Sequence, residues 1–134
     1  MKKQANLAFI YSILALIGGV FYREFTKLNG FEGRTTLGFI HVHYMVLGVF
    51  FFLIMMLVIK ELKLEQKLDK VINIYQIGLN SAVMMLLVRG IVQVLNIELT
   101  KGGSAAISGL AGVSHIILGV SLLKILWEIR KAAK

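Results

Sequence analysis

Four apolar runs, each roughly 20 residues long, constrain this chain more than any other feature of its sequence. The runs cover residues 5–22, 36–59, 71–95 and 104–127. A run of this length is sufficient to cross the hydrocarbon core of a bilayer as an α-helix. No proline interrupts any of them. The sequence therefore predicts an all-α, integral membrane four-helix bundle.

The composition and the links between the runs agree with this prediction. The chain is 57% hydrophobic and only 16% charged, whereas soluble domains of this size carry more charge. Short, charged links join the runs, so we expect a single domain over residues 1–134. The first run follows a basic segment, but no small-x-small cleavage site comes after it, so it is expected to persist as a helix. The absence of cysteine excludes disulfides and thiolate metal sites.

Basic residues are distributed unevenly between the two ends of the predicted bundle. One end would carry ten of them: Lys2, Lys3, Lys60, Lys63, Lys67, Lys70, Lys124, Arg130, Lys131 and Lys134. The other end would carry four, namely Arg23, Lys27, Arg34 and Lys101. The positive-inside rule then places both termini and the link over residues 60–70 in the cytoplasm of a bacterial cell. The net charge of +8 is thus explained by topology and lipid contacts, without nucleic acid.

A shift of 74 positions aligns the first half of the chain with the second. The matched pairs are Glu24 with Glu98, Lys27 with Lys101, Gly38 with Gly112, and His41 with His115. These matches predict an internal repeat over residues 1–60 and 75–134, in which each copy is a helical hairpin. Because each copy enters from the cytoplasm and returns to it, the two hairpins would be parallel. We expect a pseudo-two-fold axis along the membrane normal to relate them.

All three histidines, His41, His43 and His115, lie within apolar runs, where ionisable side chains are rare and usually functional. A regular helix turns by about 100° per residue, so His41 and His43 would point to nearly opposite faces. Two of the histidines have glycines on the same helix face. Gly38 and Gly48 lie on the face of His41, and Gly112 and Gly119 lie on the face of His115. Such glycines allow either close helix packing or space for a flat macrocycle. We expect His41 to face His115. In that case His43 would point at the first helix or at lipid. His43 is the alternative ligand if His41 is not used.

The available ligands narrow the chemistry of such a site. Zinc and copper sites usually need three or four protein donors, whereas haem iron takes four of its donors from the porphyrin. No Asp or Glu lies within the four apolar runs, and Glu24 and Glu98 lie at helix ends. Two opposed histidines therefore favour haem. Because the C-x-x-C-H attachment motif is absent, the haem would be of the b type.

Haem also requires cations near its propionates. Arg23 and Arg34 flank the outer mouth of the predicted bundle, and Arg89 lies within the third apolar run. An arginine at that depth needs an anionic partner, either Glu24 or Glu98 or a haem propionate. The sequence supports both interpretations equally. The other polar residues expected in this layer are Tyr22, Tyr44 and Gln93.

The segment HVHYMVLG, residues 41–48, resembles the haem-bearing helices of the haem–copper oxidase superfamily and of its smaller nitric-oxide-associated relatives. The resemblance implies that His41 or His43 is an iron ligand. Those oxidases need histidines for two haems and for copper, more than the three present here. Reduction of oxygen or nitric oxide at a haem–copper centre is therefore not expected.

A second resemblance extends over nearly the whole chain. The segments VFYREFTKLNGF, HVHYMVLG, LLVRG and LTKGGSAAISGLAGVSHIILG together resemble a family of short bacterial four-helix membrane proteins of unknown function. This resemblance implies the number of helices and no activity.

Together these features predict a cytoplasmic-membrane protein that binds one b-type haem between its second and fourth helices. Its role would be electron transfer between a quinol and a redox partner protein, or haem-linked sensing of a gas, rather than that of a stand-alone enzyme. Homo-oligomers are compatible with this prediction. One alternative is copper or zinc binding or transport by all three histidines, which would require His43 to rotate inward and its helix to distort. The other is a non-catalytic assembly subunit whose histidines are only hydrogen-bonded.

Overall fold

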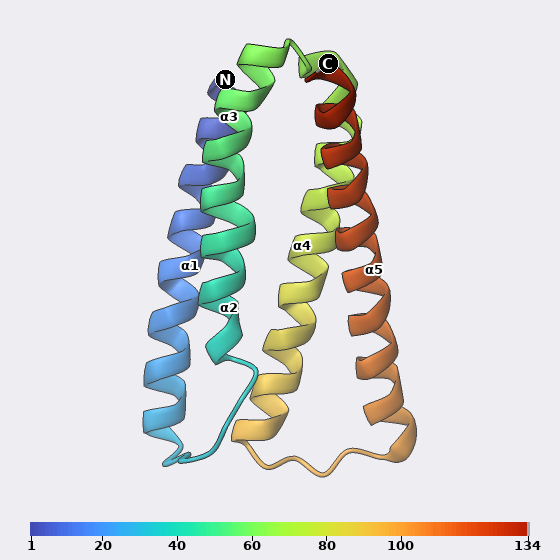
Figure 1. Ribbon diagram of the computed structural model, residues 1–134. Coiled ribbons are helices and arrows are strands. Elements are labelled where there is room, and N and C mark those ends of the chain that lie inside the picture. The colour runs from blue at the N-terminus through green and yellow to red at the C-terminus, as the bar shows by residue number, and fades with distance from the viewer. Residues whose placement is uncertain (134) are drawn as a thin grey trace.

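The computed structural model describes residues 1–133, which form four long helices, the second of them in three segments (Figure 1). The elements are α1 (Lys2–Leu28), α2 (Gly38–His43), the π-helix η1 (Tyr44–Phe50), α3 (Phe51–Leu62), α4 (Glu65–Val94) and α5 (Lys101–Ala132). No strand occurs among the described residues. The predicted all-α, four-helix architecture is confirmed.

Each of the four helices is long and apolar enough to cross a membrane. They contain 27, 25, 30 and 32 residues, whereas about 20 residues are enough to span the hydrocarbon core. Three of the four predicted runs lie within helices of the structure or extend one residue past the end. The second helix begins at Gly38, two residues after the predicted start, and the hydroxyls of Thr35 and Thr36 just before it donate to backbone carbonyls of α4.

The helices form two hairpins that lie side by side (Figure 1). One hairpin consists of α1 and the α2–η1–α3 helix, and the other of α4 and α5. Both chain termini and the α3–α4 link lie at one end of the bundle, and the α1–α2 and α4–α5 links lie at the other (Figure 1). Lys63 ends α3 in the left-handed conformation, with φ of 52°, which allows the sharp turn into α4.

Helix α4 supplies much of the buried core. Tyr75, Leu79 and Ala82 are completely buried, and α5 packs along the same helix. The two backbones approach closely at Gly78, where an added Cβ atom would lie 2.6 Å from the backbone nitrogen of Leu118. A larger residue at this position would separate the helices, so the glycine permits the tight α4–α5 hairpin.

The π-helix η1 interrupts the second long helix directly after His43. Its wider turns leave a backbone carbonyl without its usual partner, and the Tyr75 hydroxyl donates a hydrogen bond of 2.8 Å to the carbonyl oxygen of Leu47. Gly48 lies against Tyr11 of α1, where an added Cβ would be 2.7 Å from the Tyr11 Cβ. These two contacts hold the distortion in place without proline. Segments of π-helix often accompany functional sites.

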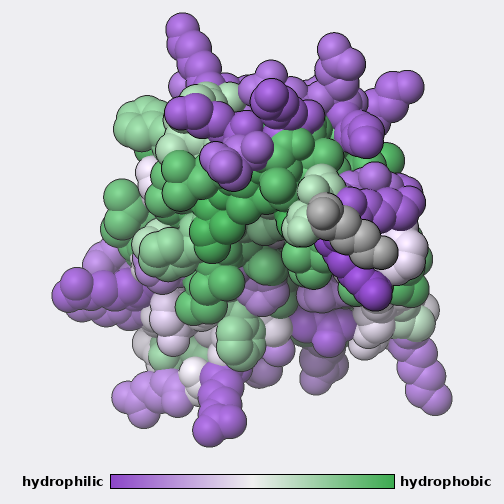
Figure 2. Space-filling model, turned by 45° about the horizontal axis from the view of Figure 1, so that its top comes forward, coloured by the Kyte–Doolittle hydropathy of each residue, from purple (hydrophilic) through white to green (hydrophobic). Residues whose placement is uncertain are grey.

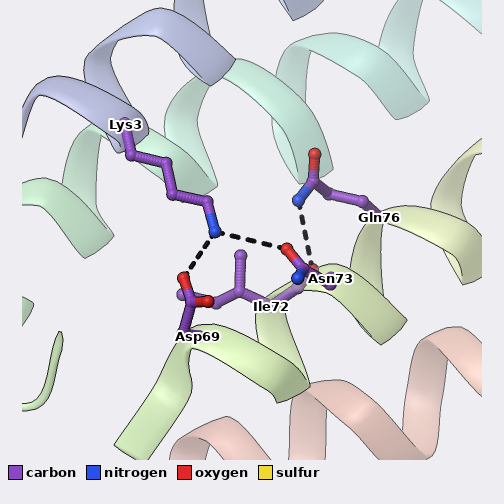
Figure 3. Close-up of polar contacts among 5 residues, drawn as sticks. All are labelled: Lys3, Asp69, Ile72, Asn73 and Gln76. Carbon is purple, nitrogen blue, oxygen red and sulfur yellow. Dashed lines mark hydrogen bonds and ion pairs between the residues drawn. The ribbon is translucent and has the colours of Figure 1, made fainter. Parts of the chain in front are cut away.

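Hydrophilic side chains gather at the end of the bundle that carries the termini, and hydrophobic residues cover much of the face below it (Figure 2). At this end Lys3 of α1 pairs with the Asp69 carboxylate and donates to the Asn73 side-chain oxygen at 3.3 Å (Figure 3). The N-terminal amino group also lies 3.6 Å from Glu65. These contacts connect the start of α1 to the first turns of α4.

Candidate functional site

Two histidines from different hairpins face each other in the bundle. The ring centroids of His43 on α2 and His115 on α5 lie 6.3 Å apart, and the two ring planes are nearly perpendicular at 89°. His43 is half-buried, and His115 is exposed within the isolated chain. We refer to these two residues as the histidine pair.

Backbone carbonyls select the tautomer of both rings. His43 Nδ1 lies 2.8 Å from the carbonyl oxygen of Phe39, and His115 Nδ1 lies 2.8 Å from that of Ala111. Each carbonyl is four residues earlier in the same helix. A carbonyl oxygen can only accept, so the neutral form of each imidazole would carry its single proton on Nδ1 and leave Nε2 as the nitrogen with a free lone pair. Histidines that ligate a metal through Nε2 typically donate from Nδ1 in this way.

His41 does not face His115, contrary to the prediction from the sequence. Its Nδ1 lies 2.9 Å from the carbonyl oxygen of Ala15, and the ring rests over Gly19 of α1. His43, which was expected to point at the first helix or at lipid, faces His115 instead. The predicted facing pair of His41 and His115 is therefore replaced by the pair of His43 and His115.

The π-helix explains this difference. A continuous α-helix repeats every 3.6 residues and would align His41 with the buried residues Phe52 and Met55. The i→i+5 hydrogen bonds of η1 take up more residues per turn and rotate the preceding segment relative to the following one. Ile40 is consequently buried in place of His41.

The four glycines predicted to line a common slot are divided between two environments. Gly38 and Gly48 pack against Tyr22 and Tyr11 of α1, so they serve close helix packing. Gly112 and Gly119 on α5 have open space where a Cβ would lie. The structure thus gives no single slot lined by all four glycines, and only the α5 glycines leave room beside His115.

Arg89 lies on the same cleft as His115. This cleft between α4 and α5 has a volume of about 220 Å³, and it is lined by Thr36, Ala82, Met85, Leu86, Arg89, Ser108, Ala111 and His115. The Arg89 guanidinium donates to the Ser108 hydroxyl at 2.7 Å. Within residues 1–133 it forms no ion pair, so neither Glu24 nor Glu98 is its partner. The half-buried cation retains donors for an anionic group.

The remaining predicted residues lie at different distances from the pair. Gln93 lines a second small cleft beside Arg89, and its side-chain oxygen accepts a hydrogen bond from the Thr36 backbone at 2.9 Å. Arg23 is exposed and lies 3.7 Å from Glu24, and Arg34 is exposed in the α1–α2 link. Neither arginine has a contact with the histidine pair among the hydrogen bonds and ion pairs of the described residues.

Tyr44 belongs to a separate polar network. Its hydroxyl donates to the Asn80 side-chain oxygen at 3.2 Å, and the Asn80 amide donates to the Tyr11 hydroxyl at 3.0 Å. Asn80 and Tyr11 were not predicted as site residues from the sequence. A signal was present, because Asn80 is an amide in the middle of an apolar run, where a polar side chain requires partners.

The three histidines do not form one metal site. Within the part of the chain that the structure describes, no group of three or more His, Cys, Asp or Glu residues is arranged to hold a metal ion. His41 is bound to α1 on the side away from the histidine pair. The donor set that remains is two imidazoles, which suits a metal whose other ligands come from a macrocycle.

Comparison with known proteins adds a family and no activity. Residues 1–132 match the family described as "Protein of unknown function (DUF2871)". This confirms the predicted resemblance to a family of unknown function over nearly the whole chain. No curated protein and no solved structure matches the chain. The local resemblance to haem–copper oxidases gains no support from these comparisons.

Proposed function

The chain belongs to DUF2871, a family of unknown function, and from the geometry of the histidine pair we propose that it is a membrane protein that binds one b-type haem. His43 and His115 would be the axial ligands, so the haem would lie between α2 and α5. These are the second and fourth of the long helices, as the sequence predicts. The ligand on the second helix would be His43, the alternative to His41.

The arrangement of the two imidazoles carries this proposal. Two imidazoles bound to one metal at roughly 2 Å each have their ligating nitrogens about 4 Å apart. The centroid of each ring lies farther from the metal than its ligating nitrogen does. The distance between the two centroids is therefore larger than the distance between the two nitrogens. The observed separation of 6.3 Å is of this size. With Nδ1 directed to a backbone carbonyl in both rings, each Nε2 lone pair is free to ligate a metal ion.

The charge beside the pair and the open glycine positions on α5 also support haem. Arg89 lines the cleft beside His115 and has no carboxylate partner among residues 1–133, so a propionate would satisfy it. The open positions at Gly112 and Gly119 leave room along α5 on the side of His115. Gln93 and Ser108 would contribute further polar contacts near the propionates.

Bis-histidine ligation favours electron transfer over gas sensing. When bound, the haem supplies an iron that changes between the ferric and ferrous states. The chain's own residues would hold the iron on both axial sides and leave no position open for a gas. The protein would therefore transfer electrons between a quinol and a redox partner rather than act as a stand-alone enzyme.

We also propose that the helices span the bacterial cytoplasmic membrane, with the termini and the α3–α4 link in the cytoplasm. Basic residues at that end and the apolar length of all four helices support this topology. The pseudo-two-fold relation between the hairpins remains part of the proposal. The histidine pair does not follow this symmetry. The repeat matches His115 with His41, whereas the residue facing His115 is His43.

The absorption spectrum of the protein purified in detergent from a haem-supplied bacterial host tests the proposal. A Soret band with one haem and one iron per chain is expected. Copper or zinc without a Soret band would instead indicate the metal-binding alternative. A colourless protein without metal would indicate an assembly subunit.

A further inference from the structure

A third and larger cleft lies on the other side of α2 from the histidine pair. It has a volume of about 600 Å³, within the range of small-molecule sites, and it is bounded by α1, by the junction of α2 with η1, and by α4. Its walls are largely apolar, with Leu14, Ile17 and Phe21 on α1 and Val83, Leu87 and Ile91 on α4. The polar side chains that line it are Tyr44 and Asn80.

The two polar residues have unused hydrogen-bond acceptors. The Asn80 amide nitrogen uses both of its hydrogens, on the Tyr11 hydroxyl at 3.0 Å and on the Gln76 carbonyl at 2.9 Å. The Asn80 side-chain oxygen accepts one hydrogen bond, from Tyr44, and has capacity for another. The Tyr44 hydroxyl group donates its hydrogen to Asn80, and its oxygen can still accept a hydrogen bond. Asn80 lies near the middle of α4, where lipid offers no hydrogen bond.

We propose that this cleft binds the headgroup of a lipid-soluble quinol. A quinol has a flat apolar ring, two hydroxyl groups that donate hydrogen bonds, and an apolar tail. One hydroxyl would donate to the side-chain oxygen of Asn80 or to the hydroxyl oxygen of Tyr44, and the ring and tail would lie between α1 and α4. The choice of a quinol over other amphipathic ligands rests on the proposed electron-transfer function.

The position of the cleft fits an electron donor to the proposed haem. Tyr44 follows His43 directly in the chain, and consecutive helical residues point about 100° apart. The same turn of the helix therefore presents Tyr44 to the α1–α4 cleft and His43 to His115. A phospholipid acyl chain would fill the apolar walls but would leave the acceptors of Asn80 and Tyr44 unsatisfied.

Calorimetric titration of the purified protein with a reduced short-chain benzoquinol, under anaerobic conditions, tests this inference. The variants are Asn80→Leu and Tyr44→Phe. The matched control is Asn73→Leu, an asparagine two turns earlier on the same helix that contacts Lys3 rather than the cleft. The haem content of every sample is measured in parallel, and circular dichroism checks that each variant is folded.

We expect saturable binding of the quinol to the unmodified protein and to Asn73→Leu. Asn80→Leu and Tyr44→Phe should each weaken it about tenfold, as for the loss of one hydrogen bond. The inference would be overturned if the quinol did not bind saturably, or if all variants bound it with equal affinity. It would also be overturned by a co-purified phospholipid that the quinol does not displace.

Failure of this inference is distinguishable from failure of the proposed function. A protein that contains haem but does not bind the quinol would contradict the inference alone. A protein without haem whose quinol binding still depends on Asn80 would contradict the haem proposal and support the cleft as a quinol site.

Discussion

The Nδ1 atom of His41 lies 2.9 Å from the carbonyl oxygen of Ala15, so this imidazole connects α2 to α1. The ring also packs against Gly19 of α1, where an added Cβ atom would lie 3.3 Å from the Nδ1 atom of His41. His41 therefore has a complete structural role within the first hairpin. The chain uses one of its three histidines for packing and presents the other two to each other.

Replacement of His41 by alanine should reduce the stability of the first hairpin. Loss of one interhelical hydrogen bond is expected to cost about 1 kcal/mol, together with the lost contact on Gly19. Thermal unfolding in detergent, followed by circular dichroism, measures this change. An unchanged midpoint would show that the bond to Ala15 contributes nothing.

The π-helix should depend on the hydroxyl of Tyr75. Tyr75→Phe keeps the buried ring but removes the donor to the Leu47 carbonyl, so about 1–3 kcal/mol of stability should be lost. Tyr22→Phe is the control, because the Tyr22 side chain is exposed and forms no hydrogen bond with another residue described by the structure. Chemical unfolding of both variants compares them. Equal losses would argue against a specific role for the Tyr75 hydroxyl.

Arg89 should strengthen the binding of haem through its propionates. Arg89→Gln removes the charge and should raise the dissociation constant for haem by roughly 10- to 100-fold, the size expected for a hydrogen bond to a charged group. Arg34→Gln removes an arginine in the exposed α1–α2 link and should have little effect. Haem titration of the two apoproteins provides the measurement. A smaller effect at Arg89 than at Arg34 would contradict the assignment.

The topology gives a prediction that is independent of haem. Reporter fusions at residue 65 and at the C-terminus should both give cytoplasmic signals, because the sequence assigns ten of the basic residues to that end of the bundle. Fusions in the α1–α2 and α4–α5 links should give external signals. An external signal from residue 65 or from the C-terminus would reverse the proposed orientation.

The architecture was predictable because a single physical requirement dominates it. A helix satisfies its own backbone hydrogen bonds, so four apolar runs of sufficient length predict four helices from composition alone. The short links then require neighbouring runs to form hairpins. The structure has these helices and hairpins, with both termini at one end of the bundle.

The facing histidines were not fully predictable because they depend on a break in helix periodicity. The stripe of Gly38, His41 and Gly48 indicates one continuous face, but in the structure that face packs on α1. No proline precedes the π-helix, and the contacts that hold it come from Tyr11 and Tyr75 on other helices. A distortion that depends on tertiary contacts leaves little trace in the local sequence.

The haem content of three histidine variants, measured by the Soret band and by iron per chain, tests the central claim most directly. His43→Ala and His115→Ala each remove one axial ligand and should abolish stoichiometric haem binding. His41→Ala, on the same turn of the second long helix as His43, should retain haem at the level of the unmodified protein. Loss of haem from His41→Ala together with its retention by His43→Ala would contradict the proposed ligand pair.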